Sequence, residues 1–530
     1  MYRLNKGLVI LSGVIFVAVT GRLSYANDDF SRWKQQYQES FQEYKDKRDK
    51  EFTAFLKMQW KEMDLLKGKE LDTTPKPKVM PVAKPLPVKQ PQPIPTPEPV
   101  VKDEPEPQKV PELKPDPVVK IPETPKPVVE TPTLPESKPE PVVLQPVVEP
   151  EPDIKPVVPP EPRVVHKGRK IVISYMGGRH TFYYDPKLKA SFHSRVNEKA
   201  VSRFWSDLSK ADYDDLINQI NEKSDALKLN DWAYALLVNE ISKNIYSTES
   251  SQSLFSWFIL AKAGYQSRIA YNDKKVFLLV PSKQPLYAVP YFTFDKVRYY
   301  AVRFDGKDQK LGQVYTYDGN YPDAIKALNM QMNTEAQVAS KVMRRDLSFD
   351  FEGKRYQIRA AYNNDRIRFM ETYPQLDLEW YFKGKVSAVA STSLQRQLSN
   401  HMKGMDEQKA VNFLLRFVQT SLRYKTDEVQ FGKENYLFPE ETLYYPYSDC
   451  EDRSILFAWL VHSLLGMDVV GLDYPGHVAT AVRFKGRIAG DAIMHNGQRY
   501  VVADPTYINA SVGMTMPDFK KEKPEVIKIY

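Results

Sequence analysis

Residues 448–465 read SDCEDRSILFAWLVHSLL, a polar start followed by a run of apolar residues. Ile455, Trp459 and their apolar neighbours recur at the three- and four-residue spacing of one helix face, and Gly466 follows as a suitable C-cap. The pattern therefore predicts a helix that ends near Leu465. Cys450 would lie at, or just before, the N-terminus of that helix.

The residues after Gly466 change to the pattern of short strands. Strands are predicted over 468–472, over 477–482 after a Pro-Gly turn, and over 499–503. His477 would open the second of these strands, and Asp504 would follow the third. The predicted helix and the two strands can therefore bring Cys450, His477 and Asp504 together.

These three residue types are the ones that thiol catalysis needs. A thiolate attacks, an imidazole activates it and later protonates the leaving group, and a carboxylate orients the imidazole. Cys450 is the only cysteine of the chain, and His477 and Asp504 follow it at intervals of 27 residues. Unpaired N–H groups at a helix N-terminus favour a thiolate. We therefore expect a catalytic triad of Cys450, His477 and Asp504.

Other interpretations of the same residues remain open. A single cysteine is often a small buried apolar residue, and the acidic neighbours Asp449, Glu451 and Asp452 would raise its pKa. Two other histidines are weaker candidates for the base. His462 lies three turns along the helix, and His495 falls in a predicted turn.

Residues 400–510 resemble the transglutaminase-like superfamily, which has a papain-like α+β fold. The resemblance is carried by a helix over 410–419 and by three motifs: Asp449-Cys450-Glu451-Asp452, Pro475-Gly476-His477-Val478 and Asp504-Pro505-Thr506. It implies that Cys450 is the nucleophile, His477 the general base and acid, and Asp504 the orienting carboxylate. The superfamily includes cross-linking enzymes, peptidases, amidases and members that have lost activity.

A weak internal match suggests a second copy of this domain. Residues 254–280 align without gaps on 456–482, with shared Leu, Phe, Trp, Gly and Val residues. In this register Thr248 replaces Cys450 and Lys275 replaces His477. We therefore predict a degenerate transglutaminase-like domain over 163–335 and a transglutaminase-like domain with the triad over 340–530. The alternative is an unrelated α/β pattern that matches by chance.

The N-terminal residues 1–26 have the features of a secretory signal peptide. Arg3 and Lys6 precede a short apolar core, and Ala26 ends a segment with small residues at the cleavage positions. The alternative is an uncleaved anchor, for which the apolar core is short. The predicted destination is the periplasm or the outside of a bacterial cell, with no transmembrane segment after cleavage.

Residues 27–72 are predicted to contain one long amphipathic, coiled-coil-like helix. Between 28 and 67, aromatic and apolar residues recur every eleven positions, which is close to three full helical turns. Such a helix cannot bury its aromatic face alone. We expect it to self-associate or to dock on a partner; the alternative is that it packs back on the globular part.

Residues 73–162 form a segment in which Lys-Pro, Glu-Pro and Pro-Val-Val recur, without a glycine. Proline blocks helix and sheet hydrogen bonding, so this segment is predicted to be an extended polyproline II linker. We interpret it as a stiff spacer between the helix and the catalytic part.

Several further local predictions concern the globular part. A hairpin is expected over 170–184 and helices over 232–246 and 406–422, with strands over 347–351, 356–360 and 376–381. An insert over 426–447, rich in Tyr, Phe and Glu, precedes Cys450. Its tyrosines Tyr444, Tyr445 and Tyr447 are candidates for lining a substrate cleft.

The composition excludes several other classes of protein. The net charge of +8 is small for 530 residues and forms no basic stripe with interleaved aromatics, so nucleic-acid binding is not expected. One cysteine excludes an internal disulfide framework and a cysteine-rich metal site. The seven histidines are scattered. We expect no metal site and no cofactor.

The sequence thus predicts an exported cysteine enzyme that acts on amide bonds of an envelope protein or peptide through a thioester. A peptidase or amidase is favoured over a cross-linking acyl transferase. The alternative is a non-catalytic periplasmic scaffold or binding protein that uses transglutaminase-like folds to recognise a partner.

Overall fold

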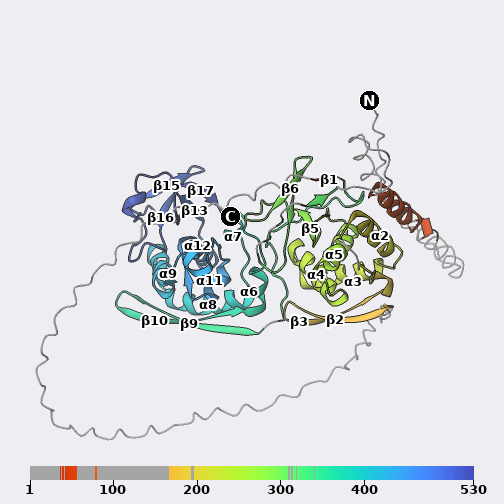
Figure 1. Cartoon of the computed structure of the whole chain (residues 1–530). Helices are drawn as coiled ribbons and strands as arrows, with labels where there is room; N and C mark the ends of the chain where they lie inside the picture. Colours follow the sequence, from red (N-terminus) through yellow and green to blue (C-terminus); the bar gives the residue numbers. More distant parts are fainter. Residues whose placement is uncertain are drawn as a thin grey trace, which may run out of the picture. The chain divides into compact units, whose positions relative to one another are not determined.

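The computed structural model describes residues 36, 39, 40, 42–56, 78–79 and 166–529, apart from 193–195, 308, 310, 312–313, 318 and 340. These residues belong to one compact unit, which contains both helices and sheets (Figure 1). The predicted α+β class is therefore confirmed. The predicted signal peptide and nearly all of the predicted linker lie outside the described residues.

The first half, residues 166–335, places its helices between a hairpin and a larger sheet (Figure 1). The hairpin pairs β2 (Arg169–Tyr175) with β3 (Gly178–Tyr184), as predicted. The helices are α2 (Glu198–Leu208), α3 (Asp214–Leu227), α4 (Asp231–Ile245) and α5 (Glu249–Lys262). The sheet contains β4 (Arg268–Tyr271), β5 (Val276–Pro281), β6 (Tyr291–Phe294), β7 (Val297–Ala301) and β8 (Tyr315–Thr316).

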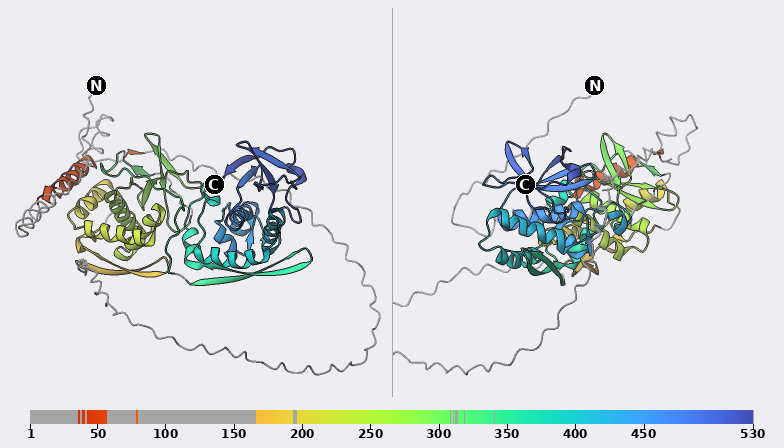
Figure 2. Two further views of the ribbon diagram at one scale, coloured as in Figure 1. Left: turned by 180° about the vertical axis from the view of Figure 1, so that it is seen from behind. Right: turned by 90° about the vertical axis from the view of Figure 1, so that its left-hand side faces the viewer.

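The second half, residues 341–529, repeats this layering, and a view from behind shows the two hairpins on the same side of the helices (Figure 2). Its hairpin pairs β9 (Val342–Phe351) with β10 (Lys354–Asn363). Its helices include α6 (Asn364–Met370), α7 (Leu378–Phe382), α8 (Ala388–Met402), α9 (Glu407–Ser421), α10 (Asp427–Phe431), α11 (Pro439–Tyr444) and α12 (Cys450–Leu465). Its sheet contains β13 (Val469–Tyr474), β14 (His477–Val482), β15 (Ala492–His495), β16 (Gln498–Ala503) and β17 (Glu525–Lys528).

Four strands of each sheet follow the same order. The first sheet runs β4-β5-β7-β6 and the second runs β13-β14-β16-β15, with every pair antiparallel. In each half the helix that precedes these strands packs on the first two of them: α5 on β4 and β5, and α12 on β13 and β14. The halves therefore share an arrangement of elements as well as the weak sequence match.

The two halves also contact each other through specific polar groups. Asn230 Nδ2 donates to Gln331 O within the first half and lies close to the hydroxyl of Tyr373 in the second half. Trp232 Nε1 donates to Thr372 Oγ1 over 3.0 Å, and Tyr287 N donates to Gln375 O over 2.9 Å. These contacts explain why 166–529 form one compact unit.

The helical residues 42–56 pack on the first half. Asp49, Phe52 and Leu56, spaced by three and four residues, are buried, and the Phe52 ring lies 4.8 Å from that of Trp205. Asp49 and Lys262 form a buried ion pair. The described part of the helix thus adopts the intramolecular alternative, and self-association remains a proposal.

Residues 78–79 differ from the prediction of an extended linker without sheet structure. They form strand β1 (Lys78–Val79), which pairs antiparallel with β8. A two-residue ladder needs only two backbone segments of extended conformation, so the flanking prolines do not prevent it. The start of the proline-rich segment is therefore attached to the first half.

The predicted strand over 376–381 is wrong, because α7 (Leu378–Phe382) occupies most of it. Leu376 and Leu378 are both buried and suggested an alternating pattern, but Tyr381 and Phe382 extend the buried set at helical spacing.

Within the described ranges, no helix combines the length and the apolar composition that a membrane span requires.

Candidate functional site

Cys450 is the first residue of α12, where the sequence pattern placed it. The helix ends at Leu465, and its C-cap Gly466 has a φ of 63°, the left-handed conformation. The Cys450 side chain is buried, and its thiol donates to Glu451 Oε2 over 2.8 Å. It also contacts the backbone N–H of Val478, the residue after His477.

His477 and Asp504 form a pair at the ends of neighbouring strands. His477 opens β14, Asp504 follows β16, and His477 Nε2 lies 2.8 Å from Asp504 Oδ2. Both side chains are buried. The other oxygen of Asp504 accepts the backbone N–H groups of Thr506 and Tyr507. The carboxylate is therefore held in a fixed position against the imidazole.

Gln419 on α9 supports this loop, a contact that the sequence pattern did not suggest. Its Nε2 donates to the backbone carbonyls of Asp504, Tyr507 and Ala510. Gln419 is buried. The amide thus connects the helix before the site to the loop that contains the carboxylate.

The second ring nitrogen of His477 is not engaged by Asp504. His477 Nδ1 is buried and has no hydrogen-bond partner among the described residues. The ring of Phe519 stacks on the imidazole at 4.9 Å. Because Nε2 is engaged by Asp504, a proton from Cys450 could be accepted only at Nδ1. The structure therefore pairs His477 with Asp504 and places the residue after His477 beside Cys450, and all three side chains are buried.

The surroundings of the thiol favour its protonated form. Burial raises the pKa of the Cys450 thiol well above its usual value, and the neighbouring carboxylates of Glu451 and Asp449 raise it further. The helix N-terminus acts in the opposite direction. Burial, which is the largest effect, and the acidic neighbours together outweigh it, so the protonated thiol is favoured.

A cluster of buried carboxylates lies beside Cys450 and was missed by sequence reasoning. Asp427, Glu434 and Glu451 have oxygens within 4.8 Å of one another, and so do Asp427, Asp449 and Asp452. Burial and the neighbouring acids raise the pKa of Asp427 to about 10. Burial and a hydrogen bond with Glu451 raise that of Glu434 to about 9.

These carboxylates can hold a hard divalent cation. Calcium accepts six to eight oxygen ligands at about 2.3–2.6 Å, so ligand oxygens within 4.8 Å of one another fit one ion. Asp449 Oδ1 is buried and lacks a hydrogen-bond partner among the described residues, which leaves it free for such an ion. The absence of a metal site stays a prediction, and no sequence pattern indicated that Asp427 and Glu434 of the insert approach Asp449 and Glu451.

The insert over 426–447 supplies two of these acids and several structural contacts. Glu440 is buried and accepts from Asn363 N and from Ser387 Oγ. Tyr445 donates its hydroxyl to Glu371 over 2.7 Å. The Tyr444 ring contacts that of Tyr362. These two tyrosines thus serve packing contacts in the structure.

The two weaker histidine candidates are not paired with Asp504. His462 lies in the last turn of α12, and His495 ends β15, where it pairs in register with Gln498. The position of His477 at the start of β14 was the informative signal.

A comparison with models of known protein families finds no match, and a comparison with curated proteins finds no significant similarity.

Proposed function

We propose that the second half is a transglutaminase-like, papain-like cysteine enzyme that acts on amide bonds through a thioester. The observation that carries the proposal is the buried His477–Asp504 pair, in which Nδ1 has no hydrogen-bond partner within the described residues and the next residue, Val478, contacts Cys450. A positioned imidazole of this kind suits proton transfer in both directions. The expected substrate is an envelope protein or peptide, because residues 1–26 suggest export.

The chemistry follows from these three side chains. His477 Nδ1 takes the thiol proton, and Cys450 Sγ forms a bond to the amide carbonyl carbon. The imidazolium then donates that proton to the departing amine as the C–N bond breaks, leaving a thioester. Water, deprotonated by His477, releases a carboxylic acid and restores the thiol. A lysine amine in place of water would form a cross-link.

The acidic neighbours set a condition on this mechanism. The Cys450 thiol donates a hydrogen bond to Glu451, so this bond must be broken or the carboxylate neutralised before attack. A cation bound by Glu451 and Asp449 would provide this neutralisation. Substrate binding that displaces Glu451 is a second route.

A non-catalytic scaffold is the second candidate function. The observation that favours it is the burial of the thiol, which raises its pKa, together with a first half in which Thr248 and Lys275 stand where the internal match has Cys450 and His477. In this case the triad would be a relic within a binding module.

A trapping experiment separates the two functions. The full chain is incubated with an envelope peptide mixture, with calcium or with chelator, and the intact protein is weighed by mass spectrometry. An enzyme gives an adduct on Cys450 that hydroxylamine releases, and His477→Ala abolishes it. The matched control His495→Ala should retain the adduct. A failure to form any adduct, with calcium and without it, would favour the scaffold.

A further inference from the structure

The first half contains a cavity at the position that corresponds to the Cys450–His477–Asp504 site. Val302 N donates to Leu278 O, and the equivalent pair in the second sheet is Ala503 with Thr480. In the register of the internal match, Leu278 corresponds to Thr480 and Lys275 corresponds to His477. Val302, the partner of Leu278, then corresponds to Ala503. The residue after Val302, Arg303, corresponds to Asp504.

The cavity has a volume of about 200 Å³ and is lined by both of these cations. Because one water occupies about 30 Å³ in the liquid, the space matches about six or seven waters. This is enough for a carboxylate and the adjoining peptide atoms. Its walls also include the apolar residues Val276, Phe277 and Val302.

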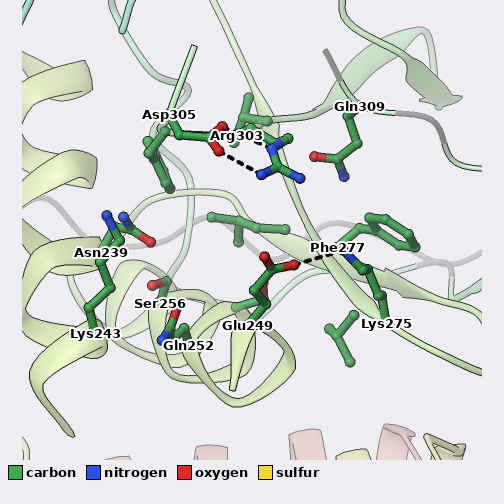
Figure 3. Close-up of a pocket in the computed structure, with 15 residues that line it drawn as sticks. Asn239, Lys243, Glu249, Gln252, Ser256, Lys275, Phe277, Arg303, Asp305 and Gln309 are labelled. Carbon is green, nitrogen blue, oxygen red and sulfur yellow. Dashed lines mark hydrogen bonds and ion pairs between the residues drawn. The ribbon is translucent and has the colours of Figure 1, made fainter. Parts of the chain in front are cut away.

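Two ion pairs occupy different sides of the cavity (Figure 3). Lys275 Nζ lies 2.8 Å from Glu249 Oε2, and Arg303 Nη2 lies 2.6 Å from Asp305 Oδ2. The Lys275–Glu249 pair is about half exposed. Exposed pairs of this kind contribute little to stability, so a carboxylate from a ligand can replace the one already present.

A buried hydroxyl provides an independent sign of a ligand. Ser256 on α5 lines the cavity and is 1% exposed, and its Oγ has no hydrogen-bond partner among the described residues. An unpaired buried hydroxyl destabilises the folded state, and a ligand acceptor would remove this cost. The amide of Gln252, on the same side, can bond to a peptide group (Figure 3).

We propose that this cavity binds the carboxylate of a peptide, with Lys275 and Arg303 as its cationic contacts and Ser256 as a donor from the floor. The first half is then a peptide-binding module that has exchanged the imidazole and carboxylate of the second half for two cations. The proposal does not depend on thiol chemistry at Cys450, and Cys450→Ala should bind the same peptides.

Calorimetric titration of the full chain at low salt tests the proposal with three acetylated tripeptides. One is an amide with a central glutamate, one is the same amide with a central glutamine, and one is trialanine with a free C-terminal carboxylate. We expect at least one of the two acids to bind about tenfold more tightly than the glutamine peptide. The better acid identifies whether a side chain or a chain terminus is recognised.

Four variants locate the binding in the cavity. Arg303→Gln should weaken binding about tenfold. Glu249→Gln should strengthen binding, because it removes the carboxylate that competes with the ligand for Lys275. Ser256→Ala should weaken binding without lowering the melting temperature, since the hydroxyl is unpaired without ligand. Lys274→Gln is the matched control, because Lys274 is exposed, adjoins Lys275 and does not line the cavity.

Three results would overturn the proposal: equal binding of the glutamine peptide and both acids, no binding of either acid at millimolar concentration, or an equal loss in Arg303→Gln and Lys274→Gln. The melting temperature of each variant shows whether it is folded.

Discussion

The Cys450 thiol is held in its protonated form by its surroundings, and this has a measurable consequence. Its pKa is raised by burial and then by Glu451 and Asp449. Less thiolate is therefore present at any given pH than in an ordinary cysteine. We expect iodoacetamide to label Cys450 slowly at pH 7.5, with a rate that still rises above pH 9.

Intact mass measures this directly, because the chain has one cysteine. Glu451→Gln should speed the labelling at pH 7.5 by removing a negative charge beside the sulfur. Glu522→Gln, at an exposed position, should leave the rate unchanged. Rapid labelling of the unmodified chain near pH 6 in chelator would contradict the expected pKa direction.

The carboxylate cluster predicts opposite effects of pH with and without a cation. The pKa values of Asp427 and Glu434 are raised in the folded state, to about 10 and about 9. Their protonated forms favour folding, so this contribution is complete below about pH 4 and is lost as pH rises through about 9–10. In chelator, the melting temperature should therefore fall from pH 5 to pH 9.

Calcium should raise the melting temperature more at pH 9 than at pH 5, because it binds the ionised carboxylates. Scanning calorimetry measures both changes. Asp427→Asn should remove most of the calcium effect, and Glu428→Gln, which changes an exposed neighbour, should not. An identical calcium shift in both variants would place the ion elsewhere.

At the scale of elements, the helical residues 42–56 stabilise the first half through a few buried contacts. Phe52 is 3% exposed and lies against the rings of Trp205 and Tyr321. Phe52→Ala should lower the free energy of unfolding by about 3–5 kcal/mol, the usual cost of truncating a buried phenylalanine.

Tyr44→Ala is the matched aromatic control, because Tyr44 is 43% exposed on the same helix. Its effect should stay within about 0.5 kcal/mol, apart from its bond to Asp323. Denaturant unfolding followed by tryptophan fluorescence compares the two. Equal stabilities would mean that the helix does not hold this position in solution.

The elements around the site were predictable because each has a strong local pattern. The apolar spacing of 454–465 and the Pro-Gly turn before His477 depend only on neighbouring residues, and α12 and β14 confirm them. The approach of Asp427 to Asp452 depends instead on how the insert folds. No local period reports such a contact, so the cluster could not be predicted.

The docking surface of the N-terminal helix shows the same limit. The aromatic face of the helix indicated that it must pack against another surface, but many surfaces can bury such a face. The buried ion pair of Asp49 with Lys262 identifies α5 as the contact, and these two residues are separated by 213 positions. Only the folded arrangement distinguishes this contact from a second copy or a partner.

At the scale of the whole molecule, the two halves share an arrangement of helices and strands but differ in the side chains at corresponding strand positions. The second keeps an imidazole and a carboxylate, and the first presents Lys275 and Arg303 at the corresponding strand positions. A peptide-binding half attached to an amide-cleaving half would increase the local concentration of substrate. The scaffold alternative requires only the binding half.

Strand β1 and the helical residues 42–56 attach two segments that precede residue 80 to the first half, to which residue 166 also belongs. A chain cut between residues 80 and 165 should therefore yield two bands on a denaturing gel and a single particle in gel filtration, because the N-terminal fragment keeps both attachments. The Phe52→Ala variant, nicked in the same way, should release its N-terminal fragment more readily.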